Sequence, residues 1–188
     1  MRYCTRLLSV LLLCLSAGMA LADGIQVDKV QVRQSEDGFQ LAVEYGVTLN
    51  FALQQALSRG IPLYFVSEFS LTRSRWYWLD EDIYQSEQST KFSYNVLTRQ
   101  YRISRGALYQ NFTSLDEALN TLSRQSSGVI PVSLMDRSSS YVAEVRLRLD
   151  TTQLPKLLQV NALTGRDWNL DSDTYRWAVR FNGEGQPE

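Results

Sequence analysis

Apolar and polar side chains alternate along much of the chain, as they do in β-strands that bury one face. In residues 39–49 every second residue, from Phe39 to Leu49, is apolar. The same period of two recurs in residues 25–32, 61–71, 141–149 and 175–181. In the first of these segments the phase of the alternation changes near Asp28, which predicts a β-bulge. The chain is therefore predicted to consist mainly of half-buried strands.

Turn residues separate these strands and indicate where they are joined. Residues 35–38 (Ser-Glu-Asp-Gly) predict a first hairpin. Two more strands are predicted at residues 92–104 and 107–112, with a tight connection around Arg105 and Gly106.

Three segments are harder to place by pattern alone: 76–78, 80–82 and 129–135. The aromatic run 76–78 predicts the start of a strand, and the acidic run 80–82 predicts a solvated interruption. Residues 129–135 predict a strand that contains Pro131. Since proline has no N–H to give to a sheet, we expect Pro131 on an edge strand or at a strand end.

Capping residues predict short helices between the strands. Asn50 predicts the N-cap of a helix over residues 51–59. Ser114 and Glu117 form a capping box, in which the serine accepts the N–H of Glu117, and Thr152 predicts the cap of a third helix. Strands with two or three inserted helices and no regular βα alternation predict a mainly β or α+β fold. We expect a single antiparallel domain that resembles a β-sandwich.

The N-terminus has the three zones of a secretory signal peptide. Arg2 and Arg6 precede the apolar residues 7–15, and an Ala-Leu-Ala cleavage motif ends at Ala22. Cleavage after Ala22 would release the chain into the periplasm. Because a membrane-spanning helix needs about 20 apolar residues, no stable transmembrane anchor is expected after cleavage.

The expected domain organisation is a signal peptide over residues 1–22 and one domain over residues 23–188. Residues 182–188 are expected to form a flexible tail.

Composition removes several classes of chemistry. The chain has no histidine, and both cysteines, Cys4 and Cys14, lie in the predicted signal peptide. Histidine- and cysteine-based catalysis and histidine-ligated zinc chemistry are therefore excluded for the mature domain, and no cofactor, metal or catalytic residue is predicted. The signal holds two of the 19 basic residues and none of the 20 acidic ones, so the mature chain carries a formal charge of −3. This balance argues against a nucleic-acid partner.

Two short motifs and the export signal together resemble the DUF4390 family of proteobacterial proteins. The motifs are Leu-Thr-Arg-Ser-Arg-Trp-Tyr-Trp at positions 71–78 and Tyr-Asn-Val-Leu-Thr-Arg-Gln-Tyr-Arg at positions 94–102. The resemblance covers nearly all of the mature chain. It implies an exported protein with a connection to a nitrogen-regulation-type sensor kinase, and it assigns no activity.

The first motif is a candidate ligand platform. The aromatic residues Trp76, Tyr77 and Trp78 could stack on apolar sugar faces, while three flanking residues bind hydroxyl groups: Arg73, Arg75 and Asp80. In a strand, however, Trp76 and Trp78 share one face and Tyr77 takes the other. The alternative is that both indoles fill the core and Tyr77 lies at its rim.

The second motif could add to this site. Arg99, Tyr101 and Arg102 would lie beside Arg73 and Arg75 if their strands pair, which would create an anion-binding or cation–π cluster. The alternative is that these arginines form cross-strand pairs with acidic residues.

Two groups of acidic residues, 80–82 and Asp167 with Asp171 and Asp173, could serve hydrolysis or calcium binding. Neither has the spacing of an EF-hand loop, which favours solvated loops.

The sequence thus leaves two functional hypotheses. The first is a non-enzymatic interaction domain whose partner is an envelope protein. The alternative is a cell-wall or glycan-binding protein, or a glycan hydrolase that uses paired carboxylates.

Overall fold

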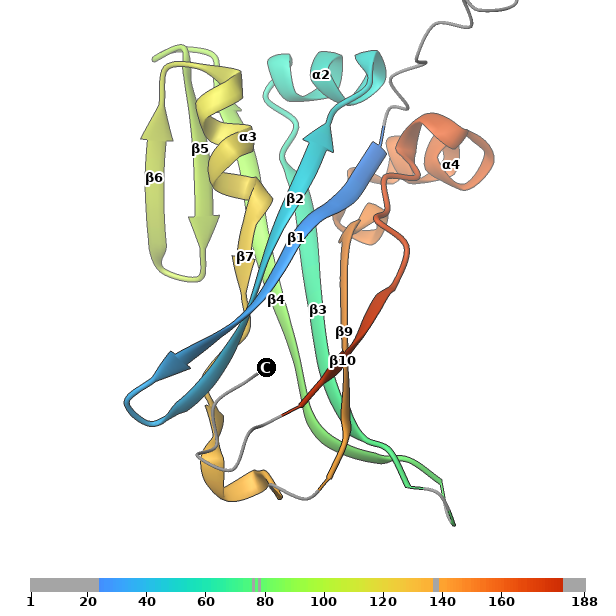
Figure 1. The fold of residues 1–188 in the computed structure, drawn as a ribbon. Helices are drawn as coiled ribbons and strands as arrows, with labels where there is room; N and C mark the ends of the chain where they lie inside the picture. Colours follow the sequence, from blue (N-terminus) through green and yellow to red (C-terminus); the bar gives the residue numbers. More distant parts are fainter. Residues whose placement is uncertain (1–23, 76, 78, 137–138, 181–188) are drawn as a thin grey trace, which may run out of the picture.

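The computed structural model describes residues 24–180 except 76, 78, 137 and 138. In these residues antiparallel strands form two sheets (Figure 1). The first sheet contains β1 (Gly24–Ser35), β2 (Gly38–Thr48), β7 (Arg124–Ser126) and β8 (Ile130–Pro131). The second contains, in spatial order, β10 (Tyr175–Val179), β9 (Tyr141–Leu149), β3 (Leu63–Arg73), β4 (Glu81–Asn95), β5 (Gln100–Arg105) and β6 (Leu108–Phe112).

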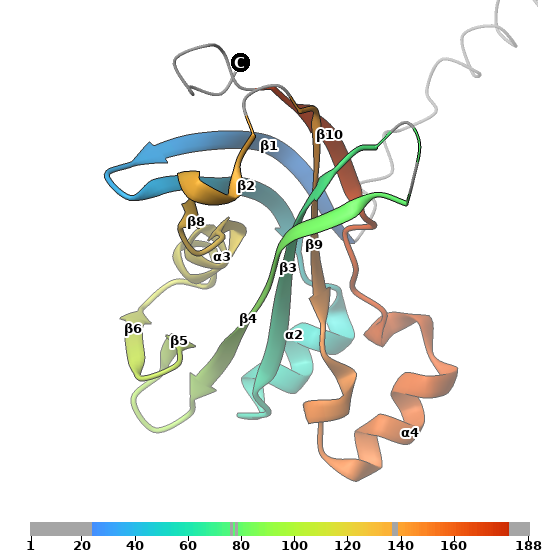
Figure 2. The ribbon, with the colours of Figure 1, turned by 90° about the horizontal axis from the view of Figure 1, so that it is seen from below.

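Short helices cover the ends and one side of these sheets (Figure 2). The described residues form the α-helices α2 (Phe51–Ser58), α3 (Leu115–Ser123) and α4 (Lys156–Thr164). Three 3₁₀ turns add η1 (Val132–Leu134), η2 (Thr151–Gln153) and η3 (Arg166–Trp168). None of the helices in the described part is long and apolar enough to cross a membrane. The prediction of a mainly β, antiparallel α+β fold is confirmed.

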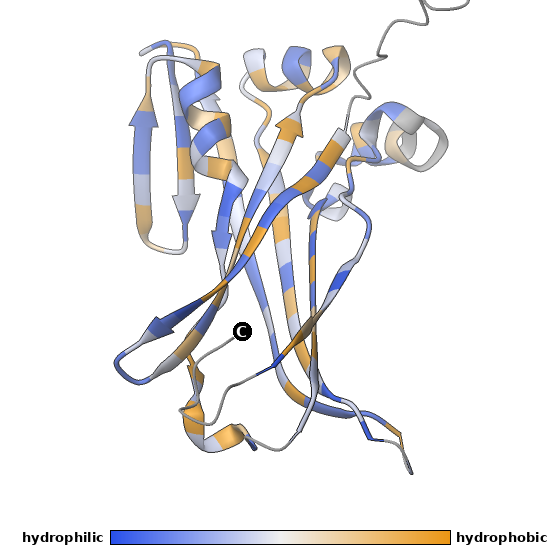
Figure 3. Ribbon diagram, in the orientation of Figure 1, coloured by the Kyte–Doolittle hydropathy of each residue, from blue (hydrophilic) through white to orange (hydrophobic). Residues whose placement is uncertain are grey.

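The core lies between the two sheets and follows the alternation of the sequence (Figure 3). Leu41 and Val43 of β2 pack in one buried cluster with Phe65 and Phe69 of β3. The β-bulge is confirmed, because the pairing of β1 with β2 shifts its register between Val27 and Lys29.

Two of the three predicted helix starts are confirmed, with one difference in detail. Asn50 Oδ1 accepts the N–H of Leu53 at 3.0 Å. Ser114 Oγ accepts the N–H of Asp116 at 3.2 Å, whereas the capping box predicted the N–H of Glu117.

The predicted cap at Thr152 is wrong. Asp150 Oδ1 accepts both the N–H and the hydroxyl of Thr152, which produces the 3₁₀ turn η2. The carbonyl of Pro155 accepts the N–H of Leu158 at 2.8 Å and of Gln159 at 3.1 Å, so α4 starts after the proline.

The strand predicted over residues 92–104 is wrong as a single strand. It is divided by a turn between Asn95 and Gln100. Asn95 Oδ1 accepts the N–H groups of Leu97 and Thr98 at 3.0 and 3.1 Å, and Arg99 adopts a positive φ of 54°. This side-chain turn replaces the sheet hydrogen bonds and reverses the chain.

Two further strand predictions need correction. The acidic run 80–82 does not interrupt the sheet, because β4 already begins at Glu81. Of residues 129–135 only Ile130 and Pro131 form a strand, which pairs with β2, and a 3₁₀ turn follows. Pro131 is the last residue of β8, as predicted for a residue that cannot donate to the ladder.

Candidate functional site

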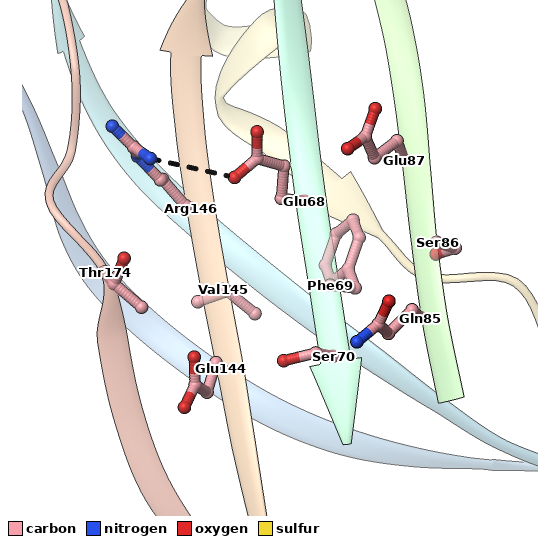
Figure 4. Close-up of a pocket in the computed structure, with 10 residues that line it drawn as sticks. All are labelled: Glu68, Phe69, Ser70, Gln85, Ser86, Glu87, Glu144, Val145, Arg146 and Thr174. Carbon is pink, nitrogen blue, oxygen red and sulfur yellow. Dashed lines mark ion pairs between the residues drawn. The ribbon is translucent and has the colours of Figure 1, made fainter. Parts of the chain in front are cut away.

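The outer face of the six-stranded sheet carries a polar pocket of about 340 Å³ (Figure 4). The polar residues that line it come from adjacent strands and one loop: Glu68, Ser70, Gln85, Ser86, Glu87, Glu144, Arg146 and Thr174. Since β3 alternates, its odd-numbered residues enter the core and Glu68 and Ser70 face outward. In the sheet register Glu68 lies opposite both Glu87 and Arg146.

Arginines neutralise most of the acids around this pocket. Arg146 Nε donates to Asp171 Oδ1 at 2.9 Å, and a second nitrogen of the same guanidinium binds the other carboxylate oxygen. Arg148 Nε donates to Glu68 Oε1 at 2.5 Å. Within the residues that the structure describes, Glu87 forms no ion pair.

The ion pair between Arg146 and Asp171 shifts the titration of both groups. The hydrogen bonds from Arg146 lower the pKa of Asp171, against the opposing effect of its partial burial. The same hydrogen bonds raise the pKa of Arg146. Both groups are therefore held in their charged forms at neutral pH.

The substitution Asp171→Asn is expected to destabilise the protein by about 1 kcal/mol at pH 7, a modest effect because both side chains remain partly exposed. A lowered pKa in the folded state gives stability that is fully present above the unfolded pKa of about 3.9 and is lost as pH falls through the folded pKa. The difference between wild type and variant should thus shrink below about pH 4. Urea unfolding at pH 7 and pH 3 measures it.

The matched control for this substitution is Glu87→Gln, at a carboxylate that lines the pocket. It should change stability by less than about 0.5 kcal/mol at pH 7, because it breaks no ion pair with a described residue. Equal losses in the two variants would contradict the assigned role of the Arg146 pair.

The pocket does not present an unengaged pair of carboxylates. Glu68 and Glu144 both line it, but each is bound by an arginine. Arg148 binds Glu68, and Arg176 Nε lies 2.7 Å from Glu144 Oε1. A glycan hydrolase needs one carboxylate as acid and one as base or nucleophile. The geometry is that of an ion-pair network on a sheet surface.

Two of the acids singled out by sequence form ion pairs with arginines. Glu81 binds Arg73 and Arg75, and Asp171 binds Arg146. Among the described residues no group of three or more acidic side chains is arranged to hold a metal ion.

Arg73 and Arg75 share one acid instead of facing a ligand. Arg73 Nη1 lies 3.5 Å from Glu81 Oε2, and Arg75 contacts the same oxygen. The guanidinium of Arg73 also lies 5.9 Å from the ring centroid of Tyr141. The alternative of a cross-strand pair with an acid is confirmed for Arg73, which lies opposite Glu81, whereas Arg75 binds the same acid from the connection after β3.

The aromatic run does not start a strand at Tyr77, which is 67% exposed in the connection between β3 and β4. This connection turns because Asp80 Oδ1 accepts the N–H of Arg75 at 3.2 Å. Trp76 and Trp78 lie outside the described residues, so their placement in the core or on a sugar platform stays a prediction.

The predicted joint cluster of the two motifs is wrong, because β4 separates their strands. Arg73 lies opposite Glu81 at the start of β4, whereas Tyr101 lies opposite Tyr94 near its end. The strand rise places these ends roughly 40 Å apart.

Residues of the second motif instead contact their neighbours in β4, β5 and β6. Arg102 stacks on Tyr109, with its Cζ atom 4.6 Å from the ring centroid, and its Nε donates to Asn111 Oδ1 at 2.8 Å. The rings of Tyr94 and Tyr101 are 4.8 Å apart, and Arg99 is exposed in the turn.

Sequence reasoning missed a feature at the edge of the same sheet. Among the described strands β6 pairs only with β5, and no drawn element lies beyond it (Figures 1 and 2). Leu108 is 80% exposed and Tyr109 61% exposed, beside a hollow of about 150 Å³ that Ile103 and Thr121 also line. The signal in the sequence is that β6 contains neither a charged residue nor proline.

Two of the other outer strands, β1 and β10, carry the features that discourage pairing with another chain. β1 contains a bulge and the charged residues Lys29 and Arg33, and β10 contains Arg176. Charges and bulges are the usual protection of sheet edges. β6 is thus the least protected of these three edges.

Comparison with known proteins gives a family and no activity. Residues 22–178 match the sequence model described as "Domain of unknown function (DUF4390)". No curated protein and no solved structure matches the chain. Since the match covers most of the sequence, the chain belongs to the DUF4390 family.

Proposed function

We propose that this protein is an exported, non-enzymatic interaction module that binds an extended strand of a partner protein along β6. The observation that carries the proposal is the uncharged and exposed outer edge of β6. On this edge the backbone N–H and C=O groups that point away from β5 have no strand to pair with among the described residues.

A partner strand would extend the six-stranded sheet by one strand. The main-chain hydrogen bonds would supply affinity, and pockets for alternate side chains would supply specificity. Leu108 and the hollow beside it offer an apolar contact to one side chain of such a strand. We therefore infer a partner segment that is extended, uncharged and apolar where it faces Leu108.

The face of β6 that carries Tyr109 and Asn111 is already ordered. Arg102 of β5 stacks on the first and donates to the second. Arg105 of the same strand donates to the carbonyls of Thr121 and Arg124 at 3.2 and 3.0 Å, which ties the hairpin to the end of α3. A strand edge held in this way loses little conformational entropy when a partner adds to it.

The compartment is part of the proposal. The positive, apolar and Ala-Leu-Ala zones of residues 1–22 support export to the periplasm with cleavage after Ala22. The partner is then an envelope protein, and a connection to a sensor kinase remains the expectation from the family resemblance.

Site-specific photocrosslinking in a proteobacterial host tests the proposal. A benzophenone amino acid replaces Leu108 or Gln110 of the full chain, and Tyr175 of the other edge strand β10 serves as the control position. Crosslinks from the two β6 positions should map to one partner segment, at residues about two apart in its sequence. Leu108→Lys should reduce the crosslink from position 110 about tenfold, because an edge lysine discourages strand addition.

Three outcomes would overturn the proposal. They are crosslinks scattered over many proteins, equal yields from Tyr175, and crosslinks only to a second copy of this chain. The last outcome would assign β6 to self-association.

A further inference from the structure

The outer face of β4 and β5 carries two cations next to two serines. Phe92 of β4 and Ile103 of β5 lie opposite each other and are buried in the core, so the residues beside them in each strand point outward. On this outward face a cation of each strand lies opposite a serine of the other: Lys91 opposite Ser104, and Arg102 opposite Ser93. The cations occupy one diagonal of a square and the serines the other. We call these four residues the cation–serine square.

The two cations of the square have no acidic partner in the described part of the chain. Neither Lys91 nor Arg102 forms an ion pair with a described residue, and both side chains are exposed. Diagonal neighbours on adjacent strands are roughly 7–8 Å apart. At this separation the two positive charges repel each other, and an anion between them can contact both.

Aromatic rings position both cations. The guanidinium of Arg102 stacks on Tyr109, and its Nε donates to Asn111 Oδ1 at 2.8 Å. No described residue accepts a hydrogen bond from its two Nη groups. Lys91 Nζ lies 5.8 Å from the ring centroid of Tyr64. Both side chains are therefore held in place by groups that leave charged N–H donors available to a ligand.

The chain around the square contains cations and no acid. Residues 88–115, which include the end of β4 and all of β5 and β6, contain no aspartate or glutamate. They contain four cations: Lys91, Arg99, Arg102 and Arg105. Arg99 is exposed in the β4–β5 turn, three residues before Arg102, and forms no ion pair with a described residue. It adds to the positive potential at this part of the sheet.

Acids in neighbouring elements do not neutralise the square. Glu87 lies on the same face of β4 but four residues before Lys91, which is roughly 13 Å by the strand rise. Asp150 lies beyond β3, where its carboxylate accepts two hydrogen bonds from Thr152. The two acids of α3 lie across the sheet, because α3 covers the other face of β5 (Figure 1).

We propose that the cation–serine square binds a phosphate group. A phosphate ester offers three acceptor oxygens and nearly two negative charges, which match two cations and two hydroxyl donors. A carboxylate offers two oxygens and one charge. Ser93 and Arg102 also line a hollow of about 330 Å³, which leaves room for a molecule that carries the phosphate. The ligand is thus inorganic phosphate or a phosphate monoester.

This site is separate from the proposed partner edge. The square lies on the face of the sheet and contains no residue of β6. Arg102 contacts β6 through Tyr109, whereas Lys91 contacts Tyr64 of β3. A substitution of Lys91 therefore reports on phosphate binding alone, and failure of the β6 crosslinks would leave its result unaffected.

Isothermal titration calorimetry of the full chain tests the site. Inorganic phosphate and glycerol 3-phosphate are titrated at constant ionic strength, with acetate as the carboxylate probe. Inorganic phosphate should bind about tenfold more tightly than acetate. Lys91→Gln and Arg102→Gln should each weaken phosphate binding about tenfold, because each removes a charged donor. Tighter binding of glycerol 3-phosphate than of inorganic phosphate would support a phosphate ester as ligand, and the reverse would support free phosphate.

The matched control is Lys29→Gln on the other sheet. Lys29 is an exposed strand lysine without an ion pair to a described residue, but it lies opposite Glu44. Its substitution should change phosphate affinity less than about twofold. The urea midpoint of Lys91→Gln should equal that of wild type, which separates binding from folding. Equal weakening by Lys29→Gln and Lys91→Gln, equal affinities for phosphate and acetate, or no measurable phosphate binding would each overturn the proposal.

Discussion

Replacing Phe65 with alanine is expected to lower the free energy of unfolding by about 3–5 kcal/mol. Phe65 lies in β3 between its partners β4 and β9, opposite Thr90 and Leu149, and its side chain has no exposed surface. The substitution removes the buried ring and leaves a cavity that neighbouring strands cannot fill without breaking sheet hydrogen bonds. Urea unfolding of the purified protein measures the change through the midpoint and slope.

The matched control is the same substitution at Phe51, which is 79% exposed. Phe51→Ala should change stability by less than about 0.5 kcal/mol, since it creates no cavity. Similar losses at the two positions would contradict the placement of the core between the sheets.

Elements that depend on neighbours in sequence were predictable. The alternation in residues 39–49 and the cap at Asn50 depend on side chains within a few residues of one another. The bulge near Asp28 was visible as a change of phase. Local geometry alone determines these features, so a pattern of period two or a capping residue is sufficient to predict them.

Local competition between two turn signals was harder to predict. The run 92–104 looks like one strand, yet Asn95 binds the backbone ahead of it and ends β4. Near α4, Asp150 and Pro155 together outweigh the capping preference of Thr152. In both places the position of the turn is decided by the side chain that hydrogen-bonds the backbone. Several side chains able to do so lie within a few residues of one another, so the sequence alone does not show which one does.

The candidate site depends on strand order, which sequence does not specify. Glu68, Glu87 and Arg146 come together only because β3 lies between β4 and β9. The same order separates Arg73 from Tyr101 and refutes their joint cluster. The exposed edge of β6 likewise follows from its position at the end of the sheet. Long-range pairing thus determines the site, and only its polar, outward-facing residues could be read from the alternation.

Replacing Gly38 with alanine is expected to destabilise the protein by about 3 kcal/mol. The cause is a steric overlap with the backbone, whereas Phe65→Ala acts by leaving a cavity. Gly38 is the first residue of β2 and pairs with Pro131 of β8. A Cβ atom there would overlap the carbonyl oxygen of Ile130 and lie 3.1 Å from Cα of Pro131. Both are backbone atoms, so the pair can accept the methyl group only if β8 moves away and withdraws the buried Ile130 from the core.

Gly106→Ala separates this close approach from the general effect of removing a glycine. Gly106 adopts a φ of +56° in the β5–β6 turn, and a Cβ atom there would meet no atom within 4 Å. Its substitution should cost about 1 kcal/mol, because only the left-handed backbone conformation is penalised. Urea unfolding of the two variants compares the losses directly. Gly38 has a φ of +158°, so its substitution carries a conformational penalty as well as the overlap with Ile130. If Gly38→Ala nevertheless lost no more stability than Gly106→Ala, the close packing of β8 against the start of β2 would be refuted.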